Sequence, residues 1–204
     1  MIGVLDYGSG NVSAFLNAFK DIGITACRVS TPETGKNIKS IILPGVGSYD
    51  WALNQLKKNG LENFLLKRVD EGMPVLGVCV GMQMLGRSSQ EGASEGLGLI
   101  EGNVERFPSE SQWPVPHMGW NNIVLERKLH PLFENISSED NFYFLHSYYF
   151  NAAERDKTIA SSVYIKQFSS VIQKENVFGC QFHPEKSHNA GLQLLLNFAK
   201  VGKC

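Results

Sequence analysis

Short apolar runs alternate with stretches of helical periodicity in the first half of the chain. The apolar runs are residues 2–6, 25–29, 40–43 and 74–78. The stretches whose apolar residues recur every three or four positions are residues 12–19, 51–56 and 61–69. Strands that alternate with helices in this way are typical of a parallel sheet with crossover helices. We therefore predict an α/β fold with a central, mostly parallel sheet flanked by helices.

The pattern changes beyond residue 92, where short β-like segments follow one another. They are residues 97–100, 104–107, 121–125, 142–145, 158–163, 170–174 and 177–182. We interpret them as an antiparallel extension of the sheet. Residues 189–201 close the chain as a helix with apolar side chains on one face. Because no repeat, low-complexity tract or linker interrupts the sequence, we predict a single domain over residues 1–204.

Composition and charge narrow the class of protein. With 204 residues, of which 43% are hydrophobic and 19% charged, the chain has the size and apolar content of one globular domain. The formal net charge is -1 and basic residues are scattered, which argues against binding to nucleic acid or to a membrane surface. Asp6 comes too early for a secretory signal, and no apolar run reaches membrane-spanning length. We expect a cytoplasmic protein.

The four cysteines, at positions 27, 79, 180 and 204, are far apart and form no Cys-x-x-Cys pair. The histidines likewise form no His-x-x-x-His pair, so we expect neither a metal site nor a cofactor. An isolated cysteine is usually a small buried hydrophobe. A reactive cysteine therefore has to be inferred from its neighbours.

Residues 77–81 (GVCVG) place Cys79 between an apolar strand and a helical run. This pattern matches the nucleophile elbow, with cysteine in place of serine. The flanking glycines let the backbone turn sharply, and a helix N-terminus favours thiolate over thiol. The alternative is that Cys79 packs in the core and the glycines only turn the chain.

A second motif, residues 179–185 (GCQFHPE), ends a β-like run in a histidine, a proline and a glutamate. Cysteine catalysis needs a base for the thiol proton and a third group that orients the base. His183 and Glu185 suit these roles, and their occurrence together with the elbow favours catalysis over a structural role. His130 and His188 lack such neighbours, so we expect them to be structural.

A glycine-rich loop follows the apolar run at residues 40–43. Acyl transfer through a tetrahedral intermediate needs amide donors for the oxyanion, and a glycine-rich loop presents them without obstruction. We therefore predict an oxyanion site from Val46 and Gly47, with Val80 after the nucleophile. By itself the loop is equally consistent with a plain turn, and its position beside the elbow strand favours the functional interpretation.

Residues 77–83 (GVCVGMQ) and 182–185 (FHPE) resemble the class I, or triad, glutamine amidotransferases. Residues 6–11 (DYGSGN), 116–121 (PHMGWN) and 186–187 (KS) resemble one branch of that family, the glutaminase subunits of imidazole glycerol phosphate synthases. The resemblance spans essentially the whole chain. It implies a flavodoxin-like α/β fold and hydrolysis of glutamine to glutamate and ammonia through a glutamyl thioester.

The resemblance also implies roles for individual positions. The implied triad is Cys79 as nucleophile, His183 as base and acid, and Glu185 as the group that orients the histidine. The implied contacts to the substrate are Gln83, Gly45 and the backbones of Ser147 and Tyr148. The positions implied at a partner interface or its gate are Tyr143, Lys186, Trp120 and Asn11. For Trp120, a place in the core remains an alternative.

The implied partner is a synthase subunit with a (βα)8-barrel fold, which makes imidazole glycerol phosphate and AICAR in histidine biosynthesis. Free ammonia is mostly protonated at neutral pH, so docked sites that exclude water keep it nucleophilic. The resemblance further implies that the lone subunit is nearly silent, and that ligand binding to the partner orders the oxyanion loop.

Three alternatives remain. A paralogous glutaminase would supply a synthase that amidates nucleotide-activated surface sugars, and residues 109–114 and 187–191 are less typical of the histidine-pathway subunits. A non-catalytic scaffold of the same fold would be expected to have lost the cysteine or histidine. A cysteine peptidase or deglycase of similar fold is disfavoured by residues 82–83 (MQ) and 183–185 (HPE).

Overall fold

The computed structural model describes residues 1–108 and 113–201. In this part of the chain the main sheet has eight strands in the order β2-β1-β3-β4-β13-β12-β11-β8. The mutually parallel strands are β2 (Ala26–Val29), β1 (Ile2–Leu5), β3 (Ser40–Gly45), β4 (Val75–Cys79) and β13 (Val177–Cys180). The antiparallel strands that follow are β12 (Lys166–Lys174), β11 (Thr158–Tyr164) and β8 (Val124–Leu125). The predicted parallel sheet with an antiparallel extension is confirmed.

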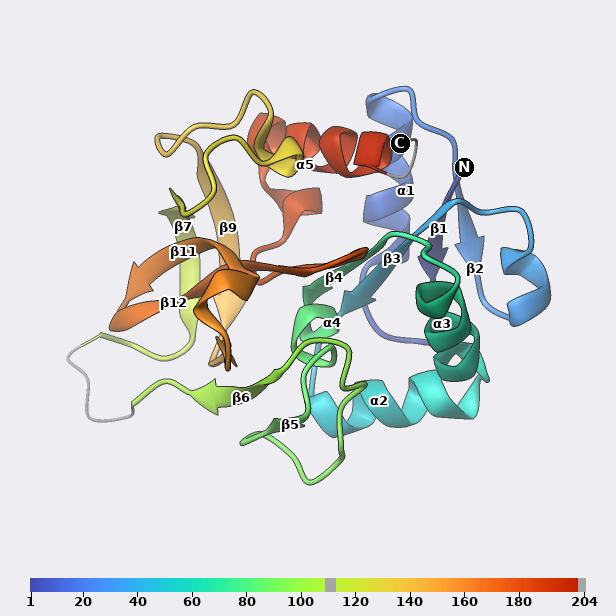
Figure 1. The fold of residues 1–204 in the computed structure, drawn as a ribbon, viewed down its shortest axis with the longest axis horizontal. Helices are drawn as coiled ribbons and strands as arrows, with labels where there is room; N and C mark the ends of the chain where they lie inside the picture. Colours follow the sequence, from blue (N-terminus) through green and yellow to red (C-terminus); the bar gives the residue numbers. More distant parts are fainter. Residues whose placement is uncertain (109–112, 202–204) are drawn as a thin grey trace.

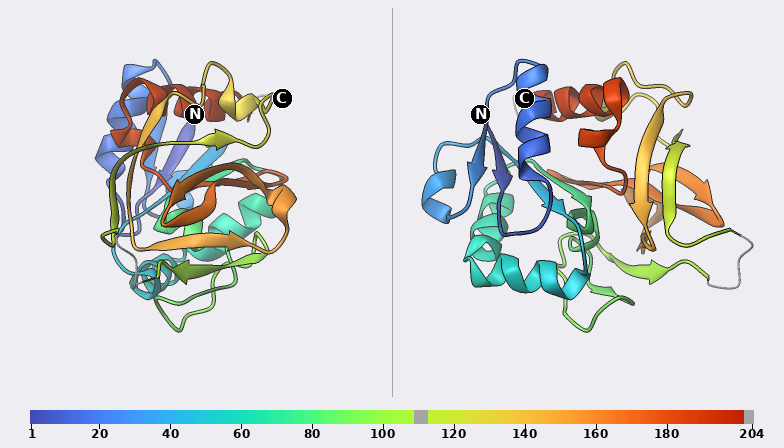
Figure 2. Two further views of the ribbon diagram at one scale, coloured as in Figure 1. Left: turned by 90° about the vertical axis from the view of Figure 1, so that its left-hand side faces the viewer. Right: turned by 180° about the vertical axis from the view of Figure 1, so that it is seen from behind.

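Helices cover both faces of the parallel strands (Figures 1 and 2). On one face lie α1 (Val12–Asp21) and α5 (His188–Val201), and on the other α2 (Tyr49–Lys58) and α3 (Leu61–Asp70). Helix α1 begins where the Asn11 side chain accepts a hydrogen bond from the Ala14 amide at 3.1 Å. Its buried residues, Val12, Phe15, Ala18 and Phe19, have the predicted helical spacing. The remaining helices are α4 (Val80–Gln83), η1 (Pro32–Gly35), η2 (Pro131–Phe133), η3 (Arg155–Lys157) and η4 (Pro184–Lys186).

Two small sheets complete the described structure. One joins β10 (Tyr148–Ala152), β6 (Gly102–Arg106) and β5 (Ser88–Ser89), and the other pairs β7 (His117–Asn122) with β9 (Asn141–His146). The sequence predicted neither β10 nor β5. The predicted strand at residues 121–125 divides into β7, which pairs with β9, and β8, which pairs with β11 in the main sheet. Ile123 between them is fully buried.

The strand predicted at residues 97–100 is wrong. Its amides donate to the segment that follows α4: Leu97 N to Met84 O at 2.8 Å and Leu99 N to Leu85 O at 2.9 Å. Since residues 84–86 are not a strand, no β-ladder forms, although the backbone groups are satisfied. The apolar residues of this segment indicate burial, but they do not distinguish a strand from an irregular segment.

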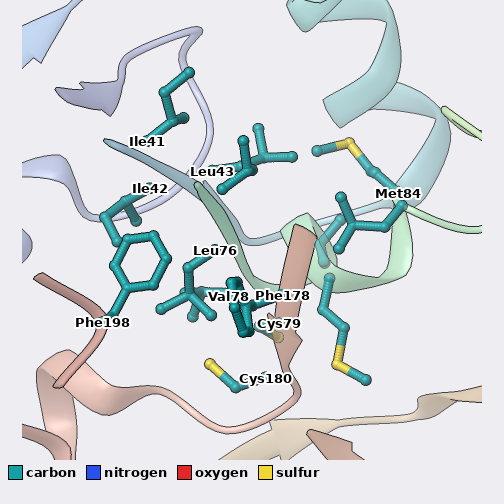
Figure 3. Close-up of a cluster of buried hydrophobic side chains, with 14 of the residues drawn as sticks. Ile41, Ile42, Leu43, Leu76, Val78, Cys79, Met84, Phe178, Cys180 and Phe198 are labelled. Atoms are coloured by element: carbon teal, nitrogen blue, oxygen red, sulfur yellow. The ribbon is translucent and has the colours of Figure 1, made fainter. Parts of the chain in front are cut away.

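The core lies where β3 and β4 are buried on both faces, which accounts for their unbroken apolar runs (Figure 3). Figure 3 shows Leu76, Val78 and Phe178 in the same cluster as Cys79. No helix within residues 1–108 and 113–201 combines the length and the apolar character that a bilayer crossing requires.

The end of β4 approaches β3 unusually closely, and glycines make the approach possible. Gly45 on β3 is the register partner of Cys79 on β4. A Cβ added to Gly81 would collide with the carbonyl oxygen of Leu43, and one added to Gly45 would collide with the Gly81 amide nitrogen. A Cβ on Gly77 would lie 2.6 Å from Gly81 O. Backbone therefore packs directly on backbone beneath the elbow.

Gly81→Ala tests this packing. We expect the free energy of unfolding to fall by about 3 kcal/mol or more, because the added methyl group meets backbone that cannot rotate away. Gly72→Ala is the matched control: Gly72 has a φ of 81° but no atom within 4 Å of an added Cβ, so it should cost only ~1–2 kcal/mol of backbone strain. Chemical denaturation of both variants decides, and equal losses would contradict the packing argument.

Candidate active site

Cys79 lies at the carboxyl end of β4, in a backbone conformation that side chains rarely adopt. Its φ is 55° and its ψ is -112°, and α4 begins at the next residue. Such strain persists only where the surroundings impose it, and it is common at catalytic residues. The pairings of β4 with β3 and β13 supply that constraint. The strand-to-helix turn predicted from residues 77–81 is present.

His183 and Glu185 form a buried pair next to Cys79. The carboxylate oxygen Oε1 of Glu185 accepts a hydrogen bond from His183 Nδ1 at 2.9 Å, and the two side chains are only 2–3% exposed. Burial by itself lowers the pKa of His183, but interactions with Cys79 and Glu185 outweigh it and raise that pKa to about 10. The direction of this shift favours the imidazolium form of His183, which can donate a proton to a leaving group.

A cavity of about 280 Å³ opens in front of Cys79. Its lining includes most of the residues predicted for the site: Val46, Gly47, Val80, Gln83, Ser147, Tyr148, His183 and Lys186. Gly45 and Glu185 are not in the lining, since Gly45 packs under the elbow and Glu185 bonds the far side of the imidazole. The cavity also has walls that the sequence did not predict: Glu91, Pro116, Leu145 and His146.

A larger cavity of about 660 Å³ lies over β10, β11 and β12. Its polar groups largely bind one another: Ser161 donates to Glu126, and Lys166 donates to Tyr149. It contains no cysteine or histidine. Size alone would favour this cavity, but the cavity in front of Cys79 is the one with reactive groups. Within the described residues, no group of three or more His, Cys, Asp or Glu side chains is arranged to hold a metal ion.

The cavity presents two oxygen acceptors next to the elbow. Gln83 uses its amide nitrogen to donate to Tyr148 O at 3.0 Å and to Gln181 Oε1 at 3.1 Å, so only its Oε1 remains for a ligand. Glu91 accepts from the Tyr49 amide at 3.0 Å, and burial raises the pKa of its carboxyl group. Glu91 stands in no recognisable motif, so the sequence alone did not single it out.

The glycine-rich loop is tied to the N-terminal segment through Ser9. The Val46 amide donates to Ser9 Oγ at 2.9 Å, and Ser9 Oγ donates to Val46 O at 2.8 Å. The Tyr7 hydroxyl donates to Pro44 O in the same stretch. Ser9 is 1% exposed. The Val46 amide is therefore occupied, whereas Gly47, with a φ of 84°, lies open at the cavity wall.

Aromatic side chains gather beside the cavity on β7 and β9. Trp120 and Tyr143 are cross-strand partners with ring centroids 5.9 Å apart, and Lys186 Nζ lies 5.8 Å from the Tyr143 centroid. Trp120 is 49% exposed and also stacks on His188 at 4.9 Å, so it is not a core residue. Asn11 takes part in none of these contacts. Its side chain caps the N-terminus of α1.

Two buried histidines, of which His146 lines the cavity, form a hydrogen-bonded chain. His146 Nδ1 donates to Tyr148 O at 2.8 Å, so His146 Nε2 is left to accept from His117 Nδ1 at 3.0 Å. Burial lowers the pKa of His117 to about 4 and that of His146 to about 3. Both rings are neutral at pH 7. His130 also has a structural role, because its ring accepts from the Leu132 amide at 3.1 Å and bonds Gln173.

Comparisons with known proteins agree with this geometry. The family model described as glutamine amidotransferase class-I matches residues 3–201, and the chain belongs to that family. Similar proteins are named imidazole glycerol phosphate synthase subunit HisH: that of Leptospira interrogans is 44% identical over 98% of this chain and 100% of its own. HisH 2 of Pseudomonas aeruginosa is 42% identical over 98% of this chain and 100% of its own. The resemblance drawn from the motifs is confirmed.

Solved structures confirm the fold. A structure described as glutamine amidotransferase superposes with a TM-score of 0.76 at 22% identity, covering 100% of this chain and 99% of that one. The glutaminase domain of Trypanosoma brucei CTPS with bound acivicin has a TM-score of 0.67 at 13% identity, covering 98% and 93%. These identities establish the α/β fold and carry no information on substrate.

The neutral histidine pair predicts acid sensitivity. Because burial lowers both pKa values below 6.5, the unfolded chain binds protons more readily, and stability should fall as pH drops from 6.5 towards 5. Each histidine contributes at most ~1.4 kcal/mol per pH unit. His117→Gln removes one titrating group and keeps a donor for His146, so the slope should decrease. Denaturation at several pH values measures it, and an unchanged slope would contradict the assignment.

Proposed function

We propose that this chain is a glutaminase that hydrolyses L-glutamine, serving as the ammonia-producing subunit of an imidazole glycerol phosphate synthase in histidine biosynthesis. The observation that carries the proposal is the strained Cys79 beside a buried His183–Glu185 pair, in one cavity of a class-I glutamine amidotransferase. The names of the similar proteins support the choice of synthase.

The reaction follows from the arrangement around Cys79. The thiolate attacks the side-chain amide carbon of glutamine, and a C–S bond forms as the carbonyl oxygen becomes an oxyanion. His183 donates its proton to the leaving nitrogen, the C–N bond breaks, and ammonia departs from a glutamyl thioester. His183, now neutral, takes a proton from water that attacks the thioester. Cleavage of the C–S bond releases glutamate and restores the thiolate.

Substrate recognition uses the acceptors and donors that the protein leaves unoccupied. Gln83 Oε1 and the Glu91 carboxylate bind the α-ammonium group, since both are acceptors at the cavity wall. The α-carboxylate needs donors, which the backbone amides of Ser147 and Tyr148 supply. The carbonyls of these two residues already accept from Phe107 N and Gln83 Nε2. Gly45 contributes by keeping the β3 backbone close to the elbow.

The aromatic cluster suits a docking surface for a (βα)8-barrel synthase. Trp120 is about half exposed beside Tyr143 and Lys186, and Lys186 also lines the cavity. Exposed aromatic side chains of this kind are enriched in protein interfaces. Docking there closes the cavity mouth and lets ammonia pass to the synthase without protonation by solvent. Asn11, at the start of α1, is assigned to the periphery of the same interface.

The oxyanion site is incomplete in this conformation. Val80 and Gly47 supply amides at the cavity, but the Val46 amide is bonded to Ser9. We assign the low activity expected of the lone chain to this bond. A ligand of the partner that favours the loop conformation with a free Val46 amide would shift the population towards the active state.

The test is ammonia release from glutamine. Adding the barrel synthase and its ribonucleotide substrate should raise the rate about 5- to 150-fold, the usual range of coupling between two sites. Cys79→Ala should abolish release, whereas Cys27→Ala, at a half-buried thiol outside the cavity, should not change it. A rate independent of Cys79, or of any partner, would contradict the proposal. If only a sugar-amidating synthase activates the chain, glutamine hydrolysis by Cys79 stands but the assignment to histidine biosynthesis is wrong.

Ser9→Ala tests whether the hydrogen bonds between Ser9 and Val46 hold the oxyanion loop in its inactive conformation. It removes two hydrogen bonds to Val46, each worth ~1 kcal/mol, so basal ammonia release by the lone chain should rise about 5- to 30-fold. Ser13→Ala, on the exposed side of α1, is the matched control and should have no effect. Unchanged basal activity of Ser9→Ala would show that this bond does not hold the chain inactive.

A further inference from the structure

We propose that Gln181 is a positioning residue whose side-chain amide holds the Cys79 sulfur as a thiolate and couples it to the substrate-binding residue Gln83. The proposal rests on the proposed function of this cavity. Gln181 is fully buried on the chain that leads from β13 to His183. Its Nε2 lies 3.7 Å from Cys79 Sγ, and its Oε1 accepts from Gln83 Nε2 at 3.1 Å.

The carbonyl of Tyr148 determines which way the side-chain amides of Gln83 and Gln181 point. Tyr148 O can only accept, so Gln83 must turn its NH₂ group towards it, at 3.0 Å. The second hydrogen of that NH₂ group points to Gln181 and requires an acceptor, which can only be Oε1. Gln181 Nε2 is thereby left facing Cys79. The Tyr148 carbonyl also accepts from His146 Nδ1 at 2.8 Å, which fixes it in place.

A donor aimed at the sulfur favours the anion. Hydrogen bonds to a charged acceptor are about twice as strong as those to a neutral one, and more so away from water. The sulfur also lies 3.8 Å from the carbonyl oxygen of Leu145, an acceptor that instead favours the protonated thiol. The Gln181 amide therefore offsets a contact that would otherwise keep Cys79 protonated.

The coupling to substrate follows from the same chain. An ammonium group at Gln83 Oε1 withdraws electrons from that amide and makes its N–H groups better donors to Gln181. Gln181 in turn becomes a better donor to sulfur. A ligand with the amino-acid end of glutamine thus strengthens the hydrogen bond at the nucleophile it is to meet.

The same ionisable groups face Cys79 in the native chain and in a Gln181 variant that adds no charge. Burial raises the pKa values of Tyr7, of Cys180 and of the Glu91 carboxyl group in the cavity wall. Interactions with Cys79 and Glu185 raise the pKa of His183 to about 10, and Lys186 also lines the cavity. Because all of these groups are present in both proteins, a difference between their pH profiles of Cys79 alkylation reports the loss of the amide donor.

The experiment measures alkylation of Cys79 by iodoacetamide in the full chain as a function of pH, with peptide mass spectrometry separating this cysteine from the others. Gln181→Met removes the donor to sulfur at similar volume and adds no charge beside it. Gln181→Leu also removes the donor without adding charge, and it carries the test if Gln181→Met does not fold. In each, the midpoint pH of alkylation should rise by about one unit.

Asn197→Leu is the control, since Asn197 is equally buried and donates to Leu132 O and Glu134 O, away from the cavity. It should destabilise the chain without moving the alkylation midpoint. An unchanged midpoint in a folded Gln181 variant overturns the proposal, as does an equal shift in Asn197→Leu. The assay needs neither glutamine nor a partner, so its outcome is independent of whether the chain proves to be a glutaminase.

Discussion

The site depends on the position of β4 between β3 and β13. Parallel pairing aligns the carboxyl ends of the three strands, so Gly45 lies opposite Cys79 and Cys180 lies opposite Val78. Three residues beyond the end of β13 the chain reaches His183. Nucleophile, base and glycine-rich loop come from segments far apart in sequence, and this pairing brings them to one edge. Ligands of open α/β sheets bind at that edge for the same reason.

Hydrogen bonds among polar groups near Cys79 orient the side chains of the site. The carbonyl of Tyr148 sets the orientation of the Gln83 side-chain amide and the tautomer of His146. Through Gln83 it also sets the orientation of the Gln181 side-chain amide. A second set of contacts acts on the loop, where Ser9 occupies the Val46 amide. The turn at Cys79 is thus formed while the Val46 amide is occupied. In the proposed glutaminase this amide would have to be released before it could bind an oxyanion.

Much of this arrangement could be predicted from the sequence, and the reasons are physical. Strands buried on both faces produce unbroken apolar runs, so β1, β3 and β4 were recognisable. The catalytic motifs at residues 77–81 and 183–185 are short contiguous stretches, so they can be recognised without knowledge of long-range contacts. The sequence therefore predicts that Cys79, His183 and Glu185 act together, and the structure brings the three side chains together.

Other features depend on long-range contacts that local pattern does not encode. The run at residues 97–100 is apolar because it is buried, but its neighbour at residues 84–86 is irregular, so no strand forms. Ser9 meets Val46, and Glu91 meets Tyr49, only in the folded chain. Gln181 stood inside a recognised motif, yet the direction of its amide follows from a carbonyl more than thirty residues earlier. The prediction of one domain over residues 1–204 stays a prediction.

In the proposed reaction Cys79 becomes covalently attached to the glutamyl group of the substrate. This attachment can be measured by rapid acid quench of the chain turning over glutamine with its synthase partner, followed by peptide mass spectrometry. We expect a glutamyl adduct on the peptide that contains Cys79 and on no other cysteine. Steady turnover without any adduct on Cys79, or an adduct on a different residue, would contradict it.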